Sequence, residues 1–302
     1  MPKLSENKSN DTWFMPVRGV ILVLMLFMVM PVWAGTVMVS HTDGPYNSIS
    51  LNEEKGKVAP GVVLKKGDMI TVHKRNSSVK LTGESKAVTI TYSQNNPYTV
   101  KGGEIKGGFV ESFIETISNW FVSLWKSEQN GTTAVIRGAG GRLMIPMLEG
   151  KNAQIVAKER SLHLAWIGGK APYTVQLSQK LMGDWSQVGK YEVTNSISTT
   201  LKRHNFRLYN SYKIVVRDAT KSERGTVSEI FTVVASPTVP DNLPQTKTWE
   251  AVGLAIQGNQ WIFEAYQQVA GIRKNDAEYA HASMVKNGLI AGSVAGQKRP
   301  RP

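Results

Sequence analysis

The chain has 302 residues, of which 36 are basic and 23 are acidic, and its formal net charge is +13. It contains no cysteine, which excludes a disulfide-stapled small domain, a lipid anchor on an N-terminal cysteine and a thiol enzyme. A hydrophobic fraction of 41% is enough to form the core of one large domain or of two modest ones.

The N-terminal segment has the features of a secretory signal peptide in their usual order. Arg18 precedes an apolar run from Val20 to Met30, and Val32 stands three residues before a cut after Ala34. The run is shorter than the roughly 20 apolar residues that span a bilayer, although an uncleaved anchor is the alternative. We therefore expect residues 1–34 to be a signal peptide that directs the protein to the periplasm or the extracellular space.

The exported part of the chain remains strongly basic. Residues 35–302 contain 33 basic and 21 acidic residues, a net charge of +12. Such a charge suits an anionic envelope polymer or lipid surface, and simple solubility is the other interpretation. No nucleic-acid partner is expected, because the chain lacks zinc-finger spacing, an aromatic RNA-binding signature and a basic helix with heptads.

Residues 35–104 predict a small β domain. Short runs rich in Val, Ile and Thr alternate with turns that contain Gly or Pro. In "AVTITY" one face is expected to carry Val88, Ile90 and Tyr92, and the other Thr89 and Thr91. Over about residues 55–92 the segment resembles the FecR-like periplasmic domain, on Pro60, Gly61, Leu64, Gly67, Asp68 and Ile70. The resemblance implies a β fold, and we do not extend it to a signalling role.

Residues 105–130 predict an amphipathic connecting helix. Eight apolar residues recur at helical spacing, namely Phe109, Val110, Phe113, Ile114, Ile117, Trp120, Phe121 and Leu124. Glu111 and Glu115 lie opposite, which favours docking on protein over a membrane surface. Trp120 and Trp125 are candidates for contact with a partner, although a position in the core is favoured for each.

Residues 131–236 predict a second β domain with seven strands, in "RLMIPML", "AQIVAK", "LHLAWI", "YTVQL", "KYEVT", "YKIVVRD" and "SEIFTVV". The segment resembles the fibronectin type III and bacterial immunoglobulin-like family, on Trp166, Tyr173, Val175, Phe206, Tyr212, Ile214 and Val216. The resemblance implies a β sandwich, a fold that serves adhesion, spacing, chaperone and carbohydrate-binding roles without selecting one.

The remaining segments are a linker at 237–246, a helical hairpin at 247–291 and a basic, disordered tail at 292–302. In the hairpin, "TWEAVGLAIQG" and "QWIFEAYQQVAG" have helical spacing, and the following helix is expected to begin with an N-cap at Asn275 or Asp276. Trp249 and Trp261 are further aromatic candidates for contact, and a position in the core is again favoured for each.

The segment "GGK" at 168–170 is interpreted as a turn. A phosphate loop places Lys before Ser or Thr and then a helix, whereas Lys170 is followed by Ala171 and Pro172. The five histidines share no metal-ligand spacing, so we predict no metal and no cofactor. Three acidic residues that could serve a hydrolase are read as turn or surface positions, namely Asp184, Glu192 and Asp218.

The predicted fold class is mainly β, with two small β domains, an amphipathic connecting helix and a short C-terminal helical hairpin. The predicted function is that of a non-catalytic binding or scaffold protein of the bacterial cell envelope, contacting a protein partner or an anionic surface. The strongest basic cluster comprises Lys202, Arg203 and Arg207. The alternatives are a cell-wall hydrolase and a regulatory or sensor partner in an envelope complex, and no oligomeric state is predicted.

Overall fold

The computed structural model describes residues 37–83, 86–103, 108–129, 141–237, 246–276 and 278–291. These residues form a mainly β protein with several antiparallel sheets and four α-helices, which confirms the predicted fold class. Gly35–Pro302 make one compact unit. The predicted signal peptide, its cleavage site and the C-terminal tail lie outside the described residues. Within the described ranges, no helix is both long and apolar enough to cross a membrane.

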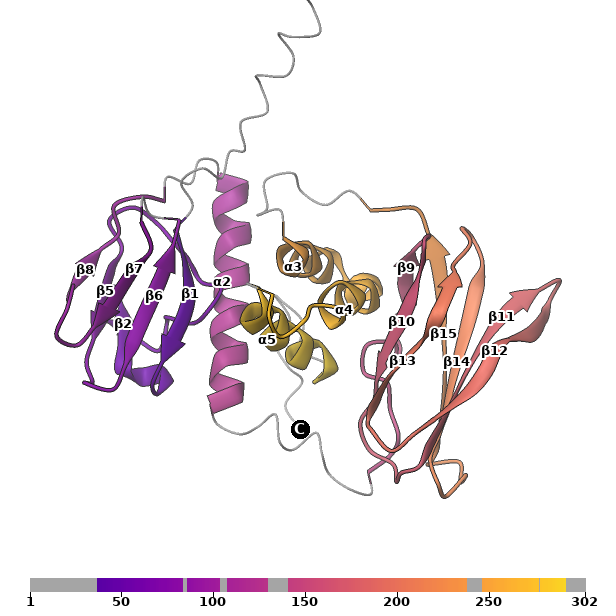
Figure 1. The fold of residues 1–302 in the computed structure, drawn as a ribbon. Coiled ribbons are helices and arrows are strands. Elements are labelled where there is room, and N and C mark those ends of the chain that lie inside the picture. The colour runs from indigo at the N-terminus through magenta and orange to yellow at the C-terminus, as the bar shows by residue number, and fades with distance from the viewer. Residues whose placement is uncertain are drawn as a thin grey trace, which may run out of the picture. The chain divides into compact units, whose positions relative to one another are not determined.

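The N-terminal strands form two four-stranded sheets, with the orders β4-β1-β6-β7 and β3-β2-β5-β8 (Figure 1). In β7 Ile90 is buried and Thr89 is exposed, as predicted, whereas Tyr92 lies in the turn after the strand and is 47% exposed. The strands are β1 (Val37–Asp43), β2 (Ile49–Leu51), β3 (Glu54–Lys55), β4 (Val63–Leu64), β5 (Met69–Val72), β6 (Ser78–Thr82), β7 (Val88–Thr91) and β8 (Tyr98–Thr99).

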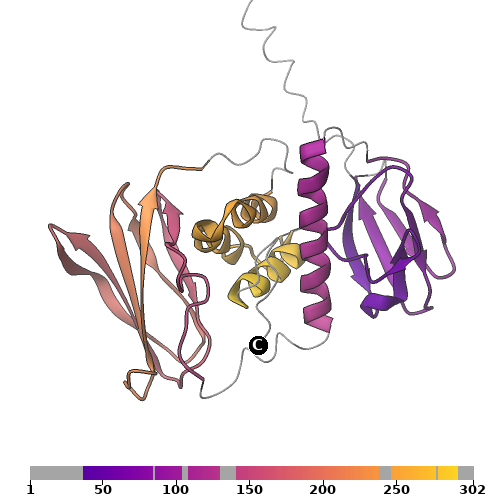
Figure 2. The same ribbon diagram turned by 180° about the vertical axis from the view of Figure 1, so that it is seen from behind.

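Helix α2 (Gly108–Gln129) confirms the predicted amphipathic helix and lies beside the N-terminal strands (Figures 1 and 2). Its described apolar stripe is buried, comprising Ile114, Ile117, Trp120, Phe121 and Leu124. Glu115 and Asn119 are exposed on the other side. The Ser118 hydroxyl accepts a hydrogen bond of 3.3 Å from the Val63 amide, so a polar contact also joins the helix to β4.

The second set of strands forms two further sheets, β12-β11-β14-β15-β9 and β10-β13. Together they are called the β sandwich below, and Figure 2 shows them from behind. Neighbouring strands are antiparallel except for β15 and β9. The strands are β9 (Gln154–Val156), β10 (Glu159–Ala165), β11 (Tyr173–Leu181), β12 (Asp184–Thr194), β13 (Ser198–Asn205), β14 (Ser211–Arg217) and β15 (Thr226–Val234).

One of the seven strands predicted for this region does not form, and one strand that does form was not predicted. The run "RLMIPML" forms a single bridge, Met144 to Ile167, followed by turns, although Leu143, Ile145, Met147 and Leu148 are all buried. The missing strand is β13, whose sequence "STTLKRHN" buries only Leu201. Burial of an apolar run therefore does not require strand pairing, and a strand can form with little apolar signal.

The C-terminal region contains three α-helices: α3 (Lys247–Gln257), α4 (Ile262–Ala270) and α5 (Tyr279–Ile290), with a 3-10 turn over Asn259–Trp261. The Thr246 hydroxyl caps α3 by accepting from the Trp249 amide at 3.4 Å. The predicted N-cap at Asn275 or Asp276 is wrong, because α5 begins at Tyr279. The Asp276 carboxylate instead accepts from the Arg273 amide at 2.8 Å, within the preceding turn.

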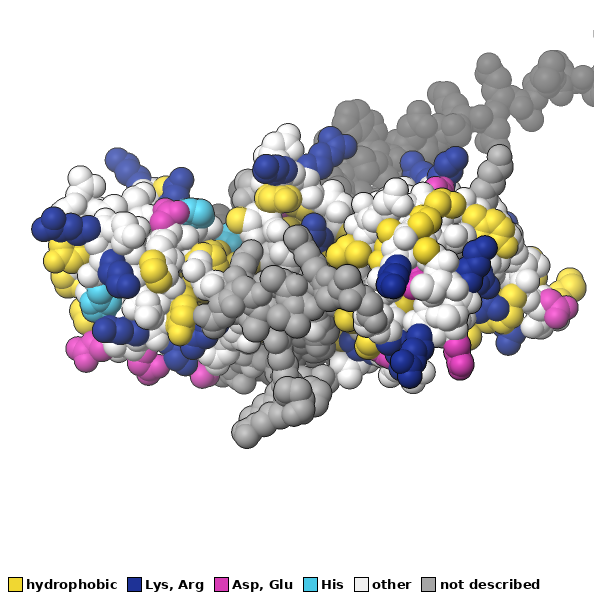
Figure 3. All heavy atoms as spheres, turned by 90° about the horizontal axis from the view of Figure 1, so that it is seen from below, with side chains coloured by type: hydrophobic (Ala, Val, Ile, Leu, Met, Phe, Trp, Pro, Cys, Tyr) yellow, Lys and Arg dark blue, Asp and Glu magenta, His cyan; other side chains and the backbone are white. Residues whose placement is uncertain are grey.

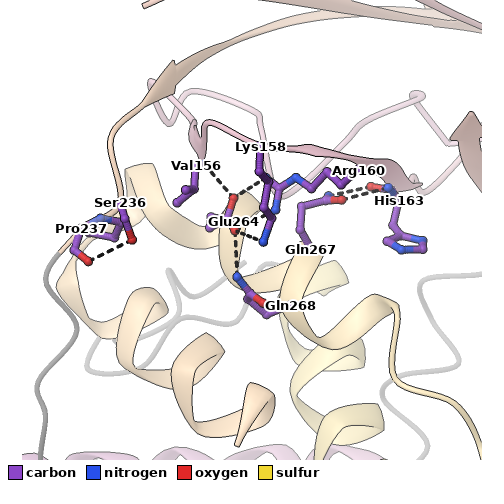
Figure 4. A network of polar contacts seen from close by, with 9 residues as sticks. All are labelled: Val156, Lys158, Arg160, His163, Ser236, Pro237, Glu264, Gln267 and Gln268. Atoms are coloured by element: carbon purple, nitrogen blue, oxygen red, sulfur yellow. Dashed lines mark hydrogen bonds and ion pairs between the residues drawn. The ribbon is translucent and has the colours of Figure 1, made fainter. Parts of the chain in front are cut away.

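A buried carboxylate joins α4 to the β sandwich (Figure 4). Glu264 is fully buried and accepts hydrogen bonds from the Val156 amide at 2.9 Å and from Arg160 Nη1 at 2.8 Å. Arg160 Nη2 makes a second contact with the same carboxylate, so the pair is bidentate. Gln268 Nε2 adds a further bond at 2.9 Å. The carboxylate is therefore well satisfied despite its burial.

Gln267, on the same helix, occupies the free edge of β10. Its side chain accepts from the His163 amide at 2.9 Å and donates to the His163 carbonyl at 2.8 Å (Figure 4). A neighbouring strand would satisfy the same two backbone groups. The helix thus covers part of an edge that would otherwise offer unpaired hydrogen-bonding groups to another chain.

Aromatic side chains continue the sandwich core into the helices. Tyr212 and Phe231 stack at a centroid distance of 5.5 Å, and Phe231 meets Phe263 of α4 at 5.3 Å. Phe206, Tyr212, Phe231 and Phe263 are all buried. Burial of four large rings in one run supplies much of the hydrophobic stabilisation at this junction.

A second junction joins α5 and α3 to α2. The Phe121 ring lies 6.0 Å from Trp249 and 6.4 Å from His281, measured between centroids. Gly288 of α5 packs so closely on Leu124 that a Cβ at this position would come within 2.3 Å of that side chain. His281 Nε2 lies 3.4 Å from the Val39 carbonyl, as a neutral ring donating from Nε2 would.

Acidification is expected to weaken the fold through this histidine. Burial lowers the pKa of His281 below its ordinary value, outweighing the hydrogen bond to Val39 and the charge of Glu278. Because the unfolded chain takes up the proton at higher pH than the folded one, stability falls as pH drops below about 6.5. Urea unfolding at pH 7 and pH 5 should show a smaller loss in His281→Gln than in the parent. Equal losses would contradict this assignment.

Candidate binding site

The four tryptophans selected from the sequence do not form one surface. Trp120, Trp249 and Trp261 are buried, at 4%, 3% and 9% exposure, and have packing roles in this structure. Trp125 is half-buried on α2. Burial, which was favoured for each tryptophan, therefore applies to three of them, and of the four only Trp125 is positioned to touch a partner directly.

The basic cluster is exposed as a binding role requires. Lys202 and Arg203 lie on β13, and Arg207 lies in the turn that follows this strand. Arg203 Nε is 3.1 Å from the Glu159 carboxylate on the neighbouring strand, and both side chains of this pair are largely exposed. Of the three cations, Arg203 is thus partly neutralised, whereas no ion pair is found for Lys202 or Arg207 among the described residues.

A groove runs beside this cluster between β12 and β13. Its volume is about 300 Å³, and it is lined by Leu177, Val188, Gly189, Glu192, Leu201, Lys202, Arg203 and His204. Leu177 and Leu201 are nearly buried and form an apolar floor, while Glu192, Lys202 and Arg203 provide charge around it. A volume of this size lies at the lower end of ligand pockets.

His204 lines the groove as a neutral ring. Burial and the positive charge of Arg207 lower its pKa below the ordinary histidine value. Its ring packs edge-on against Phe206 at 5.0 Å, and Nε2 lies 3.3 Å from the Tyr212 hydroxyl. Near neutral pH the positive charge beside the groove therefore comes from Lys202 and Arg203 and not from this histidine.

One end of the sandwich carries an apolar surface that was not predicted from the sequence. Four exposed side chains, Leu181, Met182, Leu208 and Tyr209, form what we call the apolar tip. The last pair between β11 and β14 is Gln179 with Tyr212. Leu181 and Met182 follow Gln179, and Leu208 and Tyr209 precede Tyr212, so all four lie at the same end of the sheet. In the sequence, the signal for this surface is the two-residue turn "MG" at 182–183, because such turns usually contain Asn-Gly and not an apolar residue.

The "GGK" segment is a turn between β10 and β11, as its sequence indicated. Gly168 and Gly169 have positive φ values of 74° and 72°. A Cβ on Gly168 would come within 2.3 Å of the Arg142 carbonyl oxygen, so only glycine fits there. The Lys170 amide donates to the Asp218 carboxylate at 3.0 Å, which holds this turn against the loop after β14.

Asp218 is buried, so its interpretation as a surface position is wrong. It does open a turn, because its carbonyl accepts from the Lys221 amide at 3.2 Å. It accepts from the Thr220 amide at 2.9 Å and the Thr220 hydroxyl at 2.6 Å. Burial acts to raise the pKa of Asp218, but these bonds and that from Lys170 together lower it below its usual value. This carboxylate is occupied by the scaffold.

Asp218→Asn is expected to lower the free energy of unfolding by about 1–3 kcal/mol, because an amide accepts these hydrogen bonds more weakly than a carboxylate. Asp184→Asn, at the exposed start of β12, is the matched control and should change stability by less than about 0.5 kcal/mol. Urea unfolding at pH 7 measures both. Equal effects would remove the structural role assigned to Asp218.

The described residues contain no group of three or more His, Cys, Asp or Glu side chains placed to hold a metal ion. No protein-family model matches the sequence, and no curated protein is significantly similar to it. The residues themselves therefore carry the functional argument.

Proposed function

We propose that this is an exported, non-catalytic binding protein of the bacterial cell envelope. The observation that carries the proposal is the exposed basic cluster of Lys202, Arg203 and Arg207 beside an apolar-floored groove. A surplus of positive charge next to apolar surface attracts an anionic target from a distance and then offers contact area. The net charge of +12 for residues 35–302 acts in the same direction.

The position of the cluster on a paired strand supports a binding role. β13 pairs with β10 from Glu159–Asn205 to Ala165–Ser198, and the register shifts between the pairs Arg160–His204 and Leu162–Leu201, so Lys202 and Arg203 lie in a bulge with paired residues on both sides. Side chains on a rigid strand lose less freedom on binding than those on an unpaired loop. We propose that the sandwich serves as a platform that presents these charges.

We further propose that the sandwich belongs to the immunoglobulin-like class and the N-terminal sheets to the FecR-like class. The order β12-β11-β14-β15, with β10 and β13 in the facing sheet, supports the first assignment, because immunoglobulin-like domains pair their strands in this way. The second rests on the Pro60–Gly61 and Gly67–Asp68 turns, where Gly61 and Gly67 have positive φ. Neither assignment selects a ligand.

Retention of residues 35–302 on immobilised envelope fractions tests the proposed function. Lys202→Glu with Arg207→Glu should reduce retention strongly, whereas Lys55→Glu with Lys86→Glu changes the net charge equally at exposed N-terminal positions and should not. Equal loss in both variants would mean that bulk charge alone is responsible. Turnover of wall polymer in the same fractions would favour the hydrolase alternative.

A further inference from the structure

Two residues of the apolar tip combine an unfavourable backbone conformation with full exposure. Seven described non-glycine residues have positive φ; besides Met182 (φ 49°) and Tyr209 (φ 64°) they are Asn52, Glu53, Asn95, Asn152 and Lys221. Bulky apolar side chains are uncommon in this conformation. Met182 and Tyr209 are also the two most exposed large hydrophobic side chains of the described chain, at 108% and 82%. The energetic cost of this backbone conformation is not offset by packing of either side chain within the fold, which points to contact with another molecule.

Both side chains are presented by turns that the sandwich fixes. Met182 and Gly183 connect β11 and β12, whose last pair is Leu181 with Asp184. In the other turn, the Tyr209 amide donates to the Val233 carbonyl at 2.8 Å, and the Val233 amide donates to the Asn210 carbonyl at 2.9 Å. The two apolar side chains are thus held at the sheet end before any partner arrives.

The neighbours of the apolar tip are mainly basic. Lys180 and Arg207 are exposed beside Leu181 and Leu208, and Asp184 is the acidic residue of the hairpin that lies next to the tip. Lys213 Nζ lies 4.6 Å from the centre of the Trp185 ring at the base of the hairpin. On the sandwich at the right of Figure 3, hydrophobic and basic side chains are interspersed on the surface.

Addition of a partner strand to β12 is disfavoured by the shape of this edge. Val175 pairs with Glu192 and Leu177 with Val188, so residues 189–191 oppose a single residue and form a bulge. Gly189, at its start, has a positive φ of 72°. Bulges on edge strands oppose pairing with another chain, so β12 offers an extended peptide only the short regular stretch at 184–188 beside the apolar tip.

We propose that the apolar tip inserts into the surface of a lipid bilayer with anionic headgroups. Met182 and Tyr209, with Leu181 and Leu208, enter the boundary between headgroups and acyl chains, where Tyr keeps its hydroxyl in the polar layer. Lys180 and Arg207 contact lipid phosphates from the base of the tip. A bilayer needs no preformed pocket to accept projecting side chains. This inference names the target of the proposed binding function and rests on it.

Sedimentation of residues 35–302 with vesicles tests the proposal. We expect binding to vesicles of equal phosphatidylglycerol and phosphatidylcholine, and much weaker binding to phosphatidylcholine alone. Met182→Asn with Tyr209→Asn should weaken binding by at least about tenfold, because two apolar side chains are removed. Asn tolerates positive φ, so the variant should unfold at the same or a higher urea concentration than the parent. Tyr92→Asn, at an exposed tyrosine in the turn after β7, is the control and should bind normally.

A second measurement does not depend on these variants. The chain has no cysteine, so Met182→Cys accepts a single environment-sensitive fluorophore, and Tyr92→Cys provides the matched label elsewhere. Anionic vesicles should shift the emission of the label at position 182 to the blue and leave that at position 92 unchanged. Equal responses at the two positions overturn the proposal.

The outcomes separate this inference from the proposed function. Failure of the parent to bind anionic vesicles, or unchanged binding by Met182→Asn with Tyr209→Asn, overturns the lipid proposal. If envelope retention then persists and depends on Lys202 and Arg207, the binding function stands and its target is not lipid. If neither vesicles nor envelope fractions retain the protein, both proposals fail.

Discussion

Replacement of Glu264 by glutamine is expected to lower the free energy of unfolding by about 3–5 kcal/mol. The substitution keeps the shape of the side chain but leaves the guanidinium of Arg160, which is 12% exposed, without its counter-charge. The Val156 amide also loses a charged acceptor. Urea unfolding of residues 35–302, followed by circular dichroism, measures the loss.

The exposed pair of Arg203 and Glu159 supplies the control. Glu159→Gln removes a carboxylate of the same chemistry from largely exposed surroundings and should cost less than about 1 kcal/mol. Replacing Arg160 and Glu264 together by methionine should cost less than either single change, because no unpaired charge remains buried. A loss in Glu264→Gln as small as that in Glu159→Gln would show that the pair does not hold α4 to the sandwich.

Replacement of Trp166 by alanine is expected to lower the free energy of unfolding by about 3–5 kcal/mol. Trp166 is 0% exposed and directly follows β10. Its ring meets that of Tyr173, the first residue of β11, edge-on at a centroid distance of 5.2 Å. Loss of the indole leaves a cavity that the two sheets cannot close without moving. Thermal unfolding by calorimetry measures the change.

Trp185→Ala is the matched control, because this indole is half-exposed on the hairpin. It should cost about 1 kcal/mol or less, chiefly through its contact with Lys213. If both substitutions lower the unfolding temperature equally, Trp166 is not the core residue that the sequence and its burial indicate.

Helix α2 and most strands could be predicted because their signal is local. The apolar spacing of Ile114, Ile117, Phe121 and Leu124 defines a helical face whatever packs on it. The alternation of "YTVQL" likewise yields β11, with Tyr173 and Val175 buried. β13 could not be recognised, because a strand at the edge of a two-stranded sheet faces water on much of its surface.

The candidate site was predicted in part. Charge clustering found Lys202, Arg203 and Arg207, since cations of this kind remain exposed in almost any fold. The tryptophans were less informative, because an aromatic residue at helical spacing serves core and surface equally well until its neighbours are known. Exposure of Met182 and Tyr209 depends on where adjacent strands stop, which is a property of pairing between distant segments.

The contact between Gln267 and His163 also has a consequence for the order of events during synthesis. The two residues are separated by 104 positions, so β10 leaves the ribosome long before the side chain that covers its edge. At about 5–20 residues per second, the backbone groups of His163 remain unpaired for roughly 5–20 seconds. During this interval the nascent chain presents a strand edge open to pairing with other unfolded chains, and a holding chaperone at this stage would raise the yield of native protein.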